Sequence, residues 1–208
     1  AVGGMVVPAL VYVYINFVWM NFKILIADRL YSDYKCININ TEEIVDVSIE
    51  DLFEKKILNN DLIKSFALPK KIHGTIFSKS LSGMKYGRHI DNAYMSSGRA
   101  DLSFTVFLNC KSNYEGGELS IESFNSEEKF KLDAGEIIIY PSTYLHSVEE
   151  VINGERLVFI GWIESYVKSI EEREYLFELD AAARSLLAKY GRSDEVDLIF
   201  KSYSNLLR

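Results

Sequence analysis

The feature that most constrains the fold is a series of short apolar runs between about residue 71 and residue 165. Apolar and polar residues alternate within most runs, and Gly, Asn, Asp, Ser or Pro separate one run from the next. Closely spaced runs of this kind are typical of β-sandwiches and barrels. They predict strands near 73–80, 86–91, 102–109, 117–123, 128–132, 136–140, 145–150 and 155–165. We therefore expect a mainly β protein with a double-sheet jelly roll as its core.

Helices are expected on both sides of this core. Ser48 and Asp51 have the spacing of a capping box, which predicts a helix over 49–66 that ends before Pro69. Beyond Tyr166 the apolar period becomes helical, which predicts one helix up to Gly191 and a second to about residue 207. The residues expected to face inward are Leu52, Ile57, Leu62, Ile63 and Phe66 in the first helix, and Ile170, Tyr175, Leu176, Leu179, Ala183, Leu186 and Leu187 in the next.

We find no internal repeat or linker, so residues 1–208 are expected to form a single domain. Its jelly-roll core is placed at about 71–165 and its C-terminal helical extension at 166–208. The first 22 residues carry no charge. The alternation from Val11 to Phe17 favours a buried or sheet-edge strand there, with a membrane or interfacial segment as the alternative.

The composition argues against several classes of binding partner and site. A formal net charge of −7 without a basic tract argues against nucleic-acid binding, which relies on positive surface. Cys36 and Cys110 are too few for a disulfide framework or a cysteine zinc site, and we expect two buried, reduced thiols in a cytoplasmic protein. No phosphate-binding glycine loop, nucleophile elbow or Cys-x-x-Cys pair is present.

A candidate metal site arises from three residues. His89 and Asp91 lie two apart in a predicted strand, so their side chains are expected to project from the same face. His146 follows 55 residues after Asp91, where a buried strand runs into a polar turn. Two imidazoles and one carboxylate that leave coordination positions open form the facial triad of non-haem Fe(II) oxygenases.

Other metals and other functions fit the same three residues. A zinc-dependent hydrolase uses a similar set, although no His-Glu-x-x-His sequence or general base is visible. A non-catalytic metal-binding β-sandwich is the third interpretation. The remaining histidine, His73, is expected to be structural. A mobile loop over 92–100 is expected beside the first metal ligands. The tyrosines are expected mostly in the core or at its rim, with Tyr94 and Tyr144 as candidates to line a substrate cleft; they are Tyr86, Tyr94, Tyr114, Tyr140 and Tyr144.

Arg156 favours the oxygenase among these interpretations. It lies ten residues after His146 in the last predicted strand. It shares its face of that strand with apolar residues, namely Val158, Ile160 and Trp162. A guanidinium on such a face is costly to bury without an anion, and a carboxylate is a suitable bidentate partner. We expect Arg156 to bind a dicarboxylate co-substrate.

Several motifs of this chain resemble those of the bacterial PKHD-type hydroxylases, which are prolyl-hydroxylase-like Fe(II)- and 2-oxoglutarate-dependent dioxygenases often associated with iron uptake. The resemblance extends from about residue 59 to residue 208. The motifs are Tyr86-Gly87-Arg88-His89-Ile90-Asp91, Arg99-Ala100-Asp101-Leu102-Ser103, Gly116-Gly117-Glu118-Leu119, Ala134-Gly135-Glu136, Tyr140-Pro141-Ser142, Leu145-His146 and Leu176-Phe177-Glu178-Leu179-Asp180.

The resemblance implies a double-stranded β-helix that binds Fe(II) through His89, Asp91 and His146 and holds the far carboxylate of 2-oxoglutarate with Arg156. It implies hydroxylation of a peptidyl prolyl or lysyl residue, or of a small molecule such as a siderophore, with O2 consumed and 2-oxoglutarate decarboxylated to succinate. It also leaves room for ascorbate and for a homo-oligomer. The chain departs from its relatives at Ser80, where they tend to carry a tyrosine that helps to bind the oxo acid.

Overall fold

The computed structural model describes residues 13–16, 36–37, 44–45, 48–123 and 126–208. The strands of its larger sheet are β1 (Val13–Asn16), β4 (Pro69–Leu81), β8 (Leu102–Phe107), β9 (Tyr114–Gly116), β12 (Glu136–Pro141) and β14 (Val151–Ser165). Those of its smaller sheet are β5 (Tyr86–His89), β10 (Leu119–Glu122), β11 (Glu127–Phe130) and β13 (Leu145–Val148). Short hairpins pair β2 (Cys36–Ile37) with β3 (Ile44–Val45) and β6 (Tyr94–Met95) with β7 (Gly98–Arg99).

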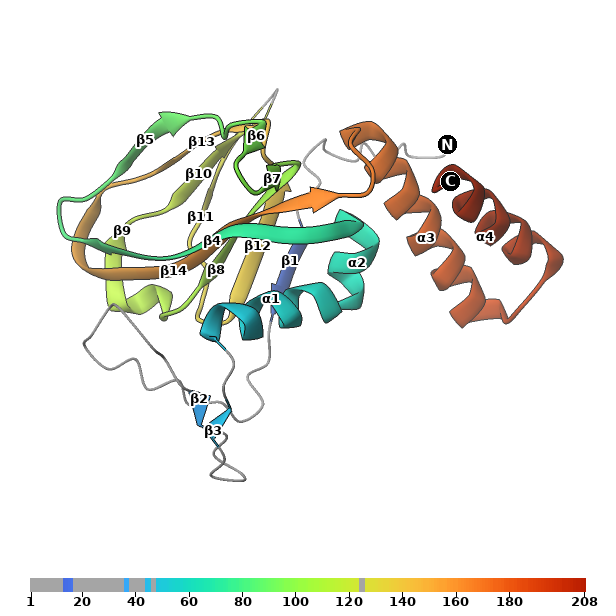
Figure 1. Ribbon diagram of the computed structural model, residues 1–208, viewed down its shortest axis with the longest axis horizontal. Coiled ribbons are helices and arrows are strands. Elements are labelled where there is room, and N and C mark those ends of the chain that lie inside the picture. Colours follow the sequence, from blue (N-terminus) through green and yellow to red (C-terminus); the bar gives the residue numbers. More distant parts are fainter. Residues whose placement is uncertain (1–12, 17–35, 38–43, 46–47, 124–125) are drawn as a thin grey trace, which may run out of the picture.

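The helices are α1 (Ile49–Asn59), α2 (Asp61–Ala67), α3 (Ile170–Tyr190) and α4 (Asp194–Leu206), with a 3-10 turn at Lys111–Asn113. α1 and α2 run along the larger sheet, and α3 and α4 form a helical pair at one end of the sandwich (Figure 1). Within the part of the chain that the structure describes, no helix combines the length and the apolar character needed to cross a membrane.

The two sheets are antiparallel and form a jelly-roll sandwich (Figure 1). The larger sheet has the strand order β1-β12-β8-β14-β4, with β9 paired to β14 beside this path. The smaller sheet has the order β11-β10-β13-β5. The prediction of a mainly β protein with a jelly-roll core and flanking helices is confirmed.

Successive residues of β12 face two different cores. Ile137 and Ile139 belong to a cluster between the larger sheet and the helices α1 and α2. Ile138 and Tyr140 belong to a second cluster, which includes Ile121 of the smaller sheet and therefore fills the sandwich. Because both faces of β12 are buried, it carries three consecutive isoleucines from Ile137 to Ile139, as expected for a strand covered on both sides.

The predicted strand near the N-terminus is confirmed for its backbone. β1 pairs with β12 in antiparallel register, from Val13 opposite Ile139 to Asn16 opposite Glu136, and it forms an edge of the larger sheet. The other residues of the uncharged segment lie outside the described ranges. The prediction of buried thiols is wrong for Cys110, which is exposed.

The single helix predicted before Pro69 is two helices in the structure. Asn60 separates them and caps α2, because its side-chain oxygen accepts hydrogen bonds from the backbone N–H groups of Leu62 and Ile63 at 3.0 and 3.1 Å. The break changes the phase of the apolar stripe. As a result Leu62 is exposed, contrary to the prediction. In α1, Phe53 is buried although it was not among the residues predicted to face inward.

The C-terminal helices end and begin where the sequence predicts. Gly191, with φ of 80°, caps α3, and Ser193 caps α4. The predicted inward face of α3 is only partly right, since Tyr175, Leu186 and Leu187 are exposed. Arg173 and Asp180 are buried instead, and both have partners. Arg173 donates to two backbone carbonyls, and Asp180 accepts a 2.6 Å hydrogen bond from Ser65.

Candidate metal centre

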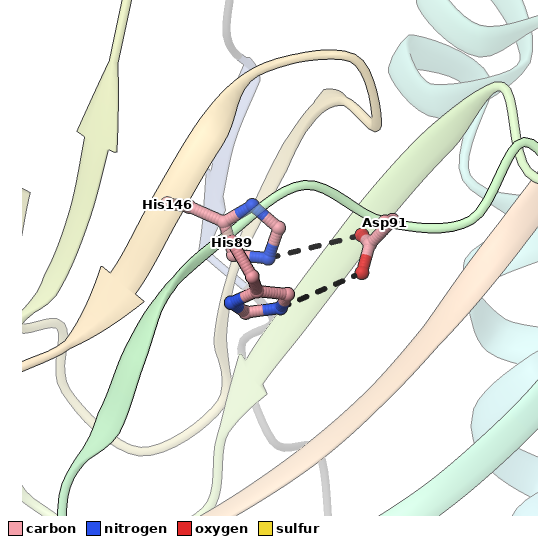
Figure 2. Close-up of side chains that lie close together, drawn as sticks. All are labelled: His89, Asp91 and His146. Atoms are coloured by element: carbon pink, nitrogen blue, oxygen red, sulfur yellow. Dashed lines mark ion pairs between the residues drawn. The ribbon is translucent and has the colours of Figure 1, made fainter.

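Two paired strands of the smaller sheet bring the two candidate histidines together. His89 of β5 lies directly opposite His146 of β13, and their ring centroids are 4.2 Å apart. Figure 2 shows that both rings face Asp91, with Nε2 of His89 3.7 Å and Nε2 of His146 3.8 Å from its carboxylate oxygens. One donor atom from each of the three residues lies within 4.8 Å of the others. The three residues could therefore hold one metal ion, as the sequence predicts.

The outer nitrogen of each imidazole is fixed by the backbone. Nδ1 of His89 is 2.9 Å from the carbonyl oxygen of Gly87, and Nδ1 of His146 is 3.0 Å from that of Tyr144. A carbonyl can only accept, so each Nδ1 carries the hydrogen and each neutral ring presents the lone pair of Nε2. Burial lowers the pKa of His146, which favours the neutral, metal-binding form.

Asp91 reaches this point by a route other than the predicted one. β5 ends at His89, so the expected strand over 86–91 is too long and strand alternation does not place the carboxylate. Asp91 follows the strand and is held by Ser103 of β8, whose hydroxyl donates a 2.5 Å hydrogen bond to Oδ2. The hydroxyl of Ser142 lies 2.7 Å from that of Ser103. The two serines therefore fix the carboxylate.

Sequence reasoning missed the roles of these serines. Both are buried, at 3% relative exposure. One signal for the role of Ser103 was available. Its hydroxyl lies inside the strand Leu102–Phe107, and all residues of this strand are buried. A buried hydroxyl requires a partner. The partner itself lies 12 residues earlier in the chain and becomes apparent only once the fold is known.

A cavity of about 850 Å³ opens between the two sheets. Its lining includes the three candidate metal ligands and Arg156. The other side chains on Arg156's face of β14, namely Val158, Ile160 and Trp162, also line the cavity, as the sequence predicts. A candidate metal site and a buried cation thus share one enclosed space.

Arg156 has the properties of an anion-binding residue. Only 3% of it is exposed, and its Nε has no hydrogen-bond partner. Burial lowers its pKa, but a guanidinium remains charged in a protein. Its stem packs beside Gly117, whose position would bring an added Cβ within 3.2 Å of Arg156 Cδ. An unpaired buried charge is costly, and a carboxylate would satisfy it, so the site fits an acidic ligand such as 2-oxoglutarate.

The remaining predictions have mixed outcomes. Ser80, where relatives tend to carry a tyrosine, pairs with Arg156 across β4 and β14 and lines the cavity. His73 is structural as predicted, with both ring nitrogens hydrogen-bonded. Tyr94 and Tyr144 do not line the cavity, and that prediction is wrong.

Tyr86 and Tyr140 line the cavity instead. The segment expected as a loop over 92–100 contains the β6–β7 hairpin. Sequence position alone did not distinguish the tyrosines, because their directions depend on strand register.

Comparison with known proteins assigns a family. Residues 75–164 match the 2OG-Fe(II) oxygenase superfamily, and residues 171–208 match the PKHD-type hydroxylase C-terminal domain. A PKHD-type hydroxylase of Prochlorococcus marinus strain MIT 9215 is 80% identical over 157 residues, which cover 76% of this chain and 71% of that protein. A PKHD-type hydroxylase of strain MIT 9515 is 64% identical over 193 residues, covering 93% and 87%.

Among solved structures, a Pseudomonas putida prolyl-4-hydroxylase aligns with a TM-score of 0.46 and 22% identity, over 55% of this chain and 64% of that one. The family assignment depends on the sequence relatives. Their identity and coverage show that the chain belongs to the PKHD-type hydroxylases of the 2OG-Fe(II) oxygenase superfamily, oxidoreductases whose family implies Fe(II) and 2-oxoglutarate.

Proposed function

We propose that His89, Asp91 and His146 bind Fe(II) and that Arg156 binds the far carboxylate of 2-oxoglutarate. The chain then hydroxylates a C–H group of a second substrate while 2-oxoglutarate is decarboxylated to succinate. The observation that carries this proposal is the buried Arg156, without a partner at Nε, in the same cavity as the two imidazoles and the carboxylate.

The imidazoles and the carboxylate contribute to metal binding in different ways. The neutral imidazoles donate lone pairs, and the Asp91 carboxylate offsets part of the ion's charge. When bound, Fe(II) supplies the activation of O2, at coordination positions that three protein ligands leave open. The neighbouring strands provide an apolar wall in Val158 and Ile160, which limits the access of water to the site.

Replacement of Ser103 by alanine should weaken iron binding without removing a ligand. The variant loses the hydrogen bond to Asp91 Oδ2, so the carboxylate is less well oriented. Outer-shell changes of this kind typically cost about 10- to 100-fold in metal affinity. Competition with a colorimetric Fe(II) chelator measures the loss. Ser120→Ala is the matched control, since Ser120 is also buried but bonds Glu127. An unchanged Fe(II) affinity in Ser103→Ala would contradict this role.

The cavity mouth suggests what kind of target enters. Four large apolar residues both line the cavity and are exposed: Ile76, Met84, Tyr86 and Ile90. An exposed apolar rim favours a target with apolar surface. We propose a peptidyl prolyl or lysyl residue, or a small molecule, as the target.

The proposed activity is tested by product formation. Apo-protein supplied with Fe(II), 2-oxoglutarate and O2 should form succinate slowly, and faster with a hydroxylatable target from a set of proline- and lysine-containing peptides and siderophores. Zn(II) in place of Fe(II) should give no succinate. Hydrolysis products with Zn(II), or no succinate under any condition, would overturn the proposal. The other expectations from the sequence remain predictions. They are ascorbate dependence, a homo-oligomer, an association with iron uptake, a single domain over 1–208 and a cytoplasmic location.

A further inference from the structure

Tyr140 has a buried hydroxyl that the proposed site does not yet use. Only 4% of the residue is exposed, and its side chain lines the cavity. Its ring packs edge-on against His146, with centroids 5.2 Å apart and planes at 67°. No hydrogen bond joins its hydroxyl to another described residue, and the hydroxyl is not among the fully enclosed polar atoms, so it is open to the cavity. A buried phenol that faces a cavity without a protein partner is a donor available to a ligand.

Charged groups from two parts of the site, Asp91 and Arg156, act on this hydroxyl. Burial raises the pKa of Tyr140, the Asp91 carboxylate raises it further and Arg156 opposes the rise. An ordinary phenol, with a pKa of about 10, carries its hydrogen at physiological pH, so the hydroxyl can donate whatever the shift. It is influenced both by the carboxylate of the candidate metal site and by the cation expected to hold the co-substrate.

The neighbouring tyrosines differ from Tyr140 in ways that single it out. Tyr114 has a buried hydroxyl that lies close to Arg156, but Tyr114 does not line the cavity. Tyr144 packs against the sandwich core and does not line the cavity either. Tyr86 lines the cavity but is 61% exposed, so water can satisfy its hydroxyl. Tyr140 alone among these four combines burial with a place on the cavity wall.

Arg156, the buried cation, has no carboxylate partner among the described residues. The groups that raise the pKa of Arg156 are the phenols of Tyr114 and Tyr140, and no carboxylate is among them. A ligand that enters this space therefore meets one guanidinium and one free phenol donor. Carboxylate oxygens match both, because each can accept charge-assisted hydrogen bonds.

We propose that the Tyr140 hydroxyl donates a hydrogen bond to a carboxylate oxygen of bound 2-oxoglutarate and is a further co-substrate-binding residue of this chain. This inference rests on the proposed function, since it concerns the same cavity. Loss of a hydrogen bond to a charged group should weaken 2-oxoglutarate binding by about 10-fold or more.

The test is Tyr140→Phe, which keeps the ring against His146 and removes only the hydroxyl. Tyr203→Phe is the matched control, because it removes a phenol hydroxyl from a half-buried residue of α4 that does not line the cavity. Each protein is loaded anaerobically with Fe(II) and titrated with 2-oxoglutarate, and Kd is read from the visible charge-transfer band. Fe(II) affinity is measured separately by chelator competition, without 2-oxoglutarate.

The expected result is a Kd for 2-oxoglutarate at least about 10-fold above that of the unmodified protein, with Fe(II) affinity unchanged and no effect in Tyr203→Phe. A Kd within twofold of the unmodified protein's would overturn the role of Tyr140 while leaving the proposed function in place. An equal loss of Fe(II) affinity would also overturn it, since the hydroxyl would then act through the metal ligands. Failure of the unmodified protein to bind 2-oxoglutarate would overturn both proposals.

Discussion

Asp91→Ala is expected to abolish stable Fe(II) binding, with a loss of affinity greater than the roughly 100-fold upper effect of outer-shell changes. Asp91 is the only carboxylate in the candidate site, and two neutral imidazoles would remain. They cannot offset the charge of the ion, and one coordination position is lost. His146→Ala should have a similar effect, because Nε2 of His146 points at the same position as that of His89. Chelator competition and turnover measure both variants.

The third histidine provides the control for these variants. His73→Asn removes an imidazole that is hydrogen-bonded to Arg99 and Ser97. It should retain the Fe(II) affinity of the unmodified protein even if it unfolds at a lower temperature. Fe(II) binding of unchanged affinity and stoichiometry in Asp91→Ala would contradict the proposed metal site.

Arg156→Met is expected to separate stability from co-substrate binding. Methionine keeps an apolar stem beside Phe107 and removes a buried charge whose Nε lacks a partner. Replacing an uncompensated buried charge by an apolar side chain of similar length is often neutral or stabilising. The free energy of unfolding of the ligand-free protein should therefore not fall. The Kd for 2-oxoglutarate should rise by about 100-fold or more, since breaking a buried charge pair costs several kcal/mol.

Lys79→Met is the matched control, because it removes a nearby cation that is paired with Glu155 and does not line the cavity. Denaturant unfolding and the anaerobic titration give the two quantities for both variants. A fall in stability with 2-oxoglutarate affinity preserved would show that Arg156 serves the fold and not the co-substrate.

The sequence alone predicted the residue types of the site because their chemistry is unusual. An arginine on an apolar strand face is costly to bury unless a ligand or a partner satisfies it. A histidine two residues from an aspartate is a weak signal by itself, and the position of His146 strengthened it. These features identified Arg156, His89 and Asp91 as candidates. Their convergence with His146 depended on strand pairing, which the spacing of runs predicted in outline.

Other parts of the site depend on register and could not be read from the chain. Ser103 holds Asp91 only because the fold brings β8 within hydrogen-bond distance of the segment that follows β5, and Tyr140 faces the cavity only through the alternation of β12. The break at Asn60 was missed for a different reason. The apolar spacing in the sequence continues across it, but the asparagine side chain caps a second helix.

The most direct test of the account is the anaerobic addition of Fe(II) and 2-oxoglutarate to the metal-free protein, followed by absorption in the visible range. The account predicts a weak charge-transfer band that appears only when both are present, that is absent in Asp91→Ala and that fades in Arg156→Met at modest 2-oxoglutarate. Stoichiometric Fe(II) binding without any band at saturating 2-oxoglutarate would contradict it.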